Sequence, residues 1–412
     1  YMGFYCKEDQ LQFEKSYVEI LKLFGEGNKS IITAFNNRLK EVNTYPGEYS
    51  DSDVNSVTPG KTGYENNPNS RIYIKLIGFD RSSSSKAQTQ HYFSHEISHA
   101  FSVAAQDVFS NRQRAGIGNY NIPYFYTTRI GNSEYLGISG SIYKKLQPNE
   151  IENVIYGGGF CEVMTDLFAV VSRVASSPDM KNQGITVDTV LKKPNKEWNK
   201  ERIISGYFAS MPLARLAIAA FSNYPNPQYQ HILNTGGSIF STMRTDTNAE
   251  VHINDFIYGS MCDPLYIAEE YNKIAGQPGA YFKLCQPMDK IVDDYAYKRP
   301  VDNKDIQFVI QQLSKFAKLR TMIKVQEGVF TQEYADKIYE EFEKVKSDVE
   351  REYGLSDKYQ QISNQNHQIT PTVIAETSKN AINENPGIVA EKVNKLHNIF
   401  KLLNRNKDDK RR

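Results

Sequence analysis

The chain has 412 residues, of which 40% are hydrophobic and 24% are charged, and its formal net charge is +1. This composition is typical of a globular protein with a sizeable core. The balanced charge argues against nucleic acid or an anionic membrane surface as a partner. No apolar run reaches the ~20 residues that a membrane span needs. The length exceeds that of one usual core and predicts two or three lobes.

The N-terminal part is predicted to mix helices and strands. Apolar residues at helical spacing predict helices within residues 11–42, and the Asn-, Ser-, Pro- and Gly-rich residues 43–70 predict a long loop. Alternating β-branched residues predict a strand over Arg71–Phe79. A helix is expected from about Lys86 to Ala105, and strands or a hairpin over residues 123–145.

From residue 151 onward the chain is predicted to be mainly helical. Helices are expected over residues 157–174, 201–221, 303–325, 330–353 and 386–403, with an irregular stretch at 276–288 and a charged tail at 404–412. The fold class expected is α+β. Its three parts are an N-terminal lobe over residues 1–150, a helical lobe over 151–300 and a helical extension over 301–412.

The four cysteines form no close pair, which argues against a cysteine zinc site. They are Cys6, Cys161, Cys262 and Cys285. Reduced, mostly buried thiols are favoured, with a disulfide between Cys262 and Cys285 as the alternative.

The pattern that points to chemistry lies at residues 95–99, which are His-Glu-Ile-Ser-His. On a helix, positions i and i+4 lie on one face, so His95 and His99 can reach one metal ion. Glu96 lies beside that ion, where it can take a proton from a bound water. Such five-residue patterns also occur by chance on surface helices. His91 shares this helical face and is expected at the rim rather than as a fourth ligand, because a catalytic zinc keeps one position for water.

A third ligand is expected downstream. Ser102 and Ala105 stand where the metzincin pattern requires Gly and His, so that pattern is absent. Further along, Glu162 and Asp166 are spaced i and i+4 on a helix with an apolar side, where a carboxylate is costly unless it meets a cation or a partner. Both carboxylates would be stabilised if Glu162 is a metal ligand and Asp166 orients a ligand imidazole. The glycine triplet at 157–159 lacks the Lys-Ser/Thr of a phosphate loop, which favours a hinge or close helix packing.

The sequence His95-Glu-x-x-His99 followed by Glu162-x-x-x-Asp166 resembles the gluzincin metallopeptidases, over roughly residues 70–260. The resemblance implies a two-lobed zincin catalytic core in which Zn²⁺ is held by His95, His99 and Glu162, with Asp166 supporting a ligand histidine. Thermolysin-like members usually have Asn before the ligand Glu, whereas this chain has Cys161.

A second fragment, Val251-His-Ile-Asn254, resembles the segment that carries the transition-state histidine of thermolysin-like enzymes. The resemblance implies that His252 donates a hydrogen bond to the developing oxyanion, with Asp246 placed to orient it. An ordinary helix-start histidine is the plainer interpretation of His252, and His231 is the competing candidate for the role.

These residues predict zinc-dependent peptide-bond hydrolysis, with Glu96 activating a zinc-bound water and His252 stabilising the oxyanion. Because the amine-anchoring Gly-x-Met-x-Asn of gluzincin aminopeptidases is absent, an endopeptidase is favoured. Its peptide or protein substrate is expected to pair with the strand at Arg71–Phe79. The alternative is a non-catalytic binding protein with a structural or degenerate zinc site, which contacts a partner through its C-terminal helices.

The first residue, Tyr1, and the abundance of Tyr, Asn and Lys favour a bacterial enzyme that is secreted or held at the cell surface. A cytoplasmic enzyme is the alternative, and the sequence leaves the oligomeric state open.

Overall fold

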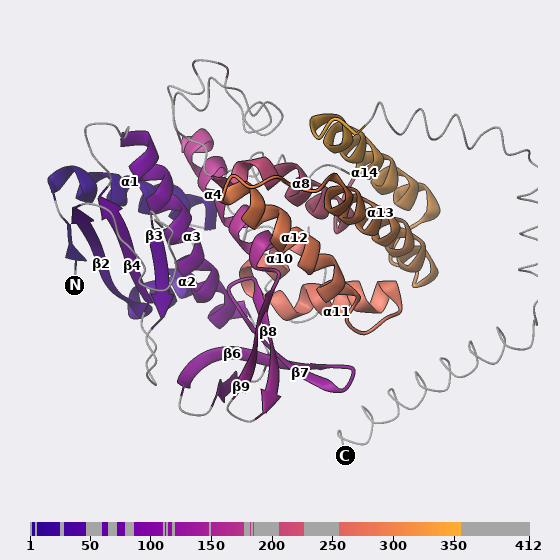
Figure 1. The fold of residues 1–412 in the computed structure, drawn as a ribbon, viewed down its shortest axis with the longest axis horizontal. Helices are drawn as coiled ribbons and strands as arrows, with labels where there is room; N and C mark the ends of the chain where they lie inside the picture. The colour runs from indigo at the N-terminus through magenta and orange to yellow at the C-terminus, as the bar shows by residue number, and fades with distance from the viewer. Residues whose placement is uncertain are drawn as a thin grey trace, which may run out of the picture. The chain divides into compact units, whose positions relative to one another are not determined.

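The computed structural model describes residues 2–4, 6–24, 29–46, 60–64, 72–78, 86–109, 112, 114–117, 120–147, 150–176, 182, 184, 206–225 and 255–355. Residues Tyr1–Glu352 form one compact unit. Within it the described elements mix helices with small sheets and are mostly helical, in agreement with the predicted class (Figure 1). The boundaries at residues 150 and 300 stay predictions. The expected helix at 386–403 and the charged tail lie outside the described residues.

The first sheet has the strand order β1-β2-β4-β3. Its strands are β1 (Met2–Gly3), β2 (Leu39–Pro46), β3 (Gly60–Tyr64) and β4 (Ile72–Gly78). Strands β1, β2 and β4 are parallel, and β3 is antiparallel to β4. The strand predicted at 71–79 is confirmed as β4, but the loop predicted at 43–70 is wrong where β2 and β3 lie. The sequence of β3, Gly-Lys-Thr-Gly-Tyr, has no apolar alternation, so its extended form depends on pairing with β4.

Strand β4 pairs on both sides, with β2 and with β3. The predicted pairing of a substrate with this strand is therefore wrong, because its backbone N–H and C=O groups already bond to neighbours. Among the described strands of this sheet, β3 lies at one edge.

Helix α3 (Lys86–Phe109) is the helix around which the N-terminal elements pack. It contacts α1 (Lys7–Phe24), α2 (Lys29–Arg38) and strands β3 and β4, and it also contacts the later helices α4 and α10 (Figure 1). The rings of Phe35 and Phe101 stack with centroids 4.2 Å apart, which joins α2 to α3. With neighbours on several sides, α3 buries polar side chains as well as its apolar stripe.

The second sheet is antiparallel throughout, in the order β5-β6-β7-β8-β9. Its strands are β5 (Arg114–Ile117), β6 (Tyr120–Ile130), β7 (Ser133–Ile138), β8 (Ser141–Gln147) and β9 (Glu150–Tyr156). The strands predicted at 123–145 are confirmed. Strand β9 extends into the part predicted to be mainly helical from residue 151, although it ends before the first helix predicted there, and its Ile151, Val154 and Ile155 follow helical spacing. Hydrogen bonding with β8 makes this segment a strand, although its apolar residues also fit the 3.6-residue period of a helix.

The remaining elements are helices, and those predicted at 157–174, 303–325 and 330–353 are confirmed. They are α4 (Gly158–Ser176), η1 (Gly206–Ser210), α8 (Met211–Ala220), α10 (Asp255–Cys262), α11 (Pro264–Ala275), α12 (Ala280–Ala296), α13 (Asn303–Gln326) and α14 (Gln332–Glu352). None of the helices in the described ranges is long and apolar enough to cross a membrane. All four cysteines are free thiols, and all but Cys6 are buried.

The stretch at 276–288, predicted to be irregular, instead contains the start of α12. Its glycines lie at the helix ends, where Gly276 ends α11 with φ 68° and Gly279 precedes α12 with φ 88°. Of the glycines and prolines in this stretch, only Pro287 lies inside α12. The sequence pattern was misleading because glycine and proline mark helix ends as well as loops.

Candidate metal centre

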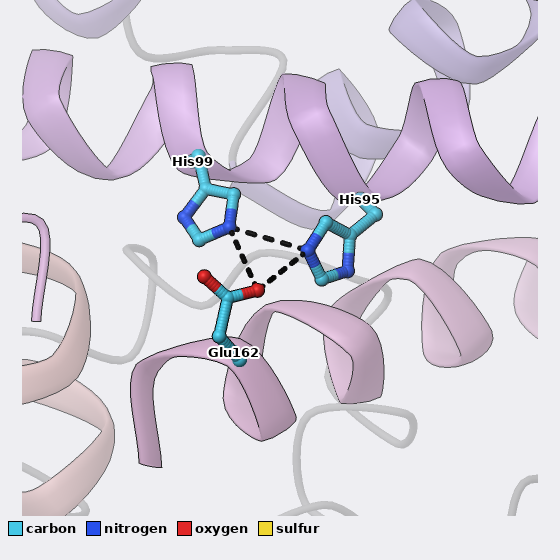
Figure 2. Close-up of side chains that lie close together, drawn as sticks. All are labelled: His95, His99 and Glu162. Atoms are coloured by element: carbon cyan, nitrogen blue, oxygen red, sulfur yellow. Dashed lines mark hydrogen bonds and ion pairs between the residues drawn. The ribbon is translucent and has the colours of Figure 1, made fainter. Parts of the chain in front are cut away.

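The candidate site lies between α3 and α4. Helical spacing places His95 and His99 one turn apart on α3, and α4 faces them with Glu162. Figure 2 shows the two imidazoles extending from one helix toward a carboxylate that comes from the other. These three predicted ligand residues are therefore brought together although Glu162 is 67 residues from His95 in sequence.

Three atoms of these side chains converge. Glu162 Oε2 lies 3.1 Å from His95 Nε2 and 3.5 Å from His99 Nε2, and the two Nε2 atoms are 3.2 Å apart. Ligands of a tetrahedral zinc ion, each about 2.0–2.1 Å from the metal, lie roughly 3.3–3.4 Å from one another. Two imidazole nitrogens and one carboxylate are also a donor set that zinc accepts. Both spacing and chemistry therefore fit a zinc ion.

The other ring nitrogen of each histidine faces an acceptor. His95 Nδ1 lies 3.4 Å from Asp166 Oδ1, and His99 Nδ1 lies 3.5 Å from Thr165 Oγ1. The Thr165 hydroxyl donates to the carbonyl of Cys161, so its lone pairs remain for His99. This arrangement favours protons on Nδ1 and leaves the Nε2 lone pairs directed at the centre, as ligand histidines require.

Charge at the site favours a cation. Burial alone lowers the pKa of His95, but hydrogen bonds to Asp166 and Glu162 outweigh it and raise this pKa to about 9. The pKa of His99 is likewise raised, by the Glu162 charge acting against burial. Burial favours the neutral acids, yet the neighbouring histidines hold the pKa values of Glu162 and Asp166 well below their usual range. A bound divalent cation would take over the positive charge that the protons supply here.

The site opens on its carboxylate side. The Glu162 side chain is 36% exposed, whereas those of His95 and His99 are 8% and 13% exposed. A ligand can therefore approach the centre more easily from the side of Glu162 than from the side of the two histidines.

Tyr207 lies beside His95, and Glu96 is near enough for its charge to act on Tyr207. Glu96 is the residue next to His95 on α3 and is 7% exposed. The ring of Tyr207, from η1, stacks on His95 at 5.6 Å with an interplanar angle of 14°. The Glu162 charge, burial and the Glu96 charge together raise the Tyr207 pKa, so both carboxylates lie within electrostatic reach of its phenol. No sequence motif marks Tyr207, and only tertiary contact identifies it.

Asp166 has a closer partner than the one predicted. Its Oδ1 lies 2.7 Å from His91 Nε2, compared with 3.4 Å from His95 Nδ1. His91 is 1% exposed, so its predicted place at the rim is wrong. The reason is that α4 covers this face of α3 and encloses His91 opposite Asp166. His91 is also outside the group of converging ligand atoms.

The N-terminus of α4 is held by Asp289 of α12. Its two carboxylate oxygens accept hydrogen bonds from the backbone N–H groups of Gly159 at 2.6 Å and Gly157 at 3.3 Å. A Cβ at Gly159 would lie 2.8 Å from Asp289 Oδ1 and 2.9 Å from its Cα. Close helix packing, one of the two predicted roles of the glycine triplet, is therefore confirmed. Burial raises the pKa of Asp289 to about 7 despite the two N–H donors.

The predicted oxyanion residue His252, its neighbour Asp246 and the competing His231 lie outside the described residues. Comparison of the chain with protein-family models, with curated proteins and with solved structures finds no match.

Proposed function

We propose that the chain is a zinc-dependent endopeptidase of the gluzincin type, with a two-lobed catalytic core. His95, His99 and Glu162 hold the ion. The observation that carries the proposal is the convergence of two Nε2 atoms and one carboxylate oxygen within 3.1–3.5 Å of one another. Acceptors beside both Nδ1 atoms and partial exposure of the carboxylate support it further.

A zinc ion held by His95, His99 and Glu162 would supply the chemistry that lowers the pKa of water and polarises a peptide carbonyl. Glu96 accepts the proton of the attacking water on its carboxylate and delivers it to the leaving amine. Asp166 keeps the proton of His95 on Nδ1, which keeps Nε2 available as a ligand. His252 donates a hydrogen bond to the developing oxyanion.

The substrate is an extended peptide, and we place it along β3 rather than β4. Both sides of β4 are paired, whereas β3 pairs only with β4 among the described strands. A peptide added to a sheet edge gains main-chain hydrogen bonds without displacing a strand. Helix α3, which carries both histidines and Glu96, contacts β3 directly.

The test combines metal analysis with proteolysis. The purified chain should contain about one zinc ion, and it should cleave casein or a peptide library in a way that a chelator abolishes and added zinc restores. Glu96→Gln is the matched control, because the amide is nearly isosteric but cannot take the proton, so zinc should stay while cleavage is lost. His99→Ala should lose both. Zinc binding without cleavage in the unaltered chain would favour the non-catalytic alternative, and no specific zinc binding would refute the proposal.

A further inference from the structure

His91 is a fully buried polar residue for which the proposed reaction has no use. It lies on α3 one helical turn before His95 and is 1% exposed. Its Nε2 is 2.7 Å from Asp166 Oδ1, a shorter contact than those of His95 with Glu162 at 3.1 Å and with Asp166 at 3.4 Å. Its Nδ1 is buried and has no hydrogen-bond partner among the described residues.

These contacts indicate which ring nitrogen of His91 carries a proton. A proton on Nδ1 would be buried with no acceptor in the described part of the chain, which is costly. A proton on Nε2 points at the Asp166 carboxylate and forms a charge-assisted hydrogen bond. Nε2 is therefore the nitrogen whose proton is held in a hydrogen bond, and His91 is a donor to Asp166.

The same oxygen of Asp166 faces both histidines of α3. Oδ1 is 2.7 Å from His91 Nε2 and 3.4 Å from His95 Nδ1. Asp166 is itself fully buried, so no solvent holds its carboxylate in place. The bond from His91 is thus one of the contacts that hold this carboxylate in its orientation toward His95. Asp166 also lies one helical turn after Glu162 on α4. A fixed Asp166 therefore helps to set how α4 presents the Glu162 carboxylate to the Nε2 atoms of His95 and His99.

We propose that His91 is a positioning residue for the metal centre: it donates Nε2–H to Asp166 and thereby holds this carboxylate where it orients His95. The proposal rests on the proposed zinc site and adds a residue to it. His91 touches neither metal nor substrate. Groups that orient ligand histidines typically change metal affinity 10–100-fold when removed, and a residue acting through such a group should have an effect at about the lower end of that range.

The experiment measures the zinc dissociation constant of the full chain by competition with a chromophoric chelator. His91→Gln and His91→Met are a matched pair of similar length, of which only Gln keeps an N–H donor near the Nε2 position. His91→Met should weaken zinc binding about 10-fold, whereas His91→Gln should stay within about 3-fold of the unaltered chain. The absorption spectrum of bound Co²⁺ should change with Met and not with Gln, because it reports ligand geometry.

Two further variants separate positioning from general destabilisation. Gln90→Met removes a side-chain bond to Glu19 from the neighbouring position of α3, so it should leave zinc affinity unchanged. In an Asp166→Ala background, which removes the acceptor of the His91 bond, His91→Met should cost less than about 2-fold. Circular dichroism of the metal-free proteins checks folding. If His91→Met does not fold, the Gln variant and its Co²⁺ spectrum carry the test, and a more than 10-fold loss of affinity with Gln overturns the proposal.

The outcomes distinguish this inference from the zinc site itself. If the unaltered chain binds zinc no better than His99→Ala, the metal centre is refuted and the role of His91 with it. If the unaltered chain binds zinc and His91→Met matches it, only the role of His91 is refuted. Additive losses from His91→Met and Asp166→Ala would also overturn it, because His91 would then act by another route.

Discussion

Gly159→Ala tests how α4 is seated against α12. The added Cβ would lie 2.8 Å from Asp289 Oδ1, 2.9 Å from Asp289 Cα and 3.1 Å from Val292 Cγ2. A backbone atom cannot rotate away as a side chain can, so the helices must separate. Overpacking of this kind costs about 1–3 kcal/mol, and Ala recovers up to ~1 kcal/mol of helix propensity. We expect a net loss of about 1–2 kcal/mol in the free energy of unfolding.

The matched control is Gly158→Ala, one residue earlier in the same helix turn. Among the described residues, its Cβ would meet only Ile155 Cγ2 at 3.5 Å, an ordinary contact. Its stability should be unchanged or higher by up to ~1 kcal/mol. Urea unfolding of the metal-free proteins, followed by circular dichroism, measures both changes. Because α4 carries Glu162, Gly159→Ala should also weaken zinc binding. Equal unfolding free energies for the two variants would refute this account of the helix contact.

Three other predictions concern the site and its surroundings. Asp166→Ala should reduce zinc affinity or activity roughly 10–100-fold, measured by chelator competition; unchanged affinity would remove its role in orienting His95. Asp289→Asn tests a pH dependence of stability. The pKa of Asp289 is raised to about 7 in the folded chain. The contribution of Asp289 to stability is therefore complete below its unfolded pKa of about 3.9 and is lost as the pH rises through about 7. Urea titrations from pH 5 to 8 should therefore show the unaltered chain losing stability relative to the variant, and parallel curves would contradict this. His252→Ala should lower kcat about 10²–10³-fold with KM and zinc content nearly unchanged, and steady-state kinetics with metal analysis would show whether it does.

Local periodicity was enough to predict much of the candidate site. The spacing of His95 and His99 on a helix, and of Glu162 and Asp166 on another, follows from the 3.6-residue turn and needs no tertiary information. The buried-carboxylate argument also anticipated that Asp166 would face a partner on another element. Strand β4 and the long helices α13 and α14 were predictable for the same reason, since their periodic patterns are long and regular.

Tertiary packing decided what lies opposite each of these faces. The approach of Glu162 to the histidines, the burial of His91 against Asp166 and the stacking of Tyr207 on His95 all join residues distant in sequence. No periodic pattern encodes such contacts, because they depend on which helix faces are brought together. The same holds for β3 and β9, whose own sequences are ambiguous and whose extended form depends on hydrogen bonds from a neighbouring strand.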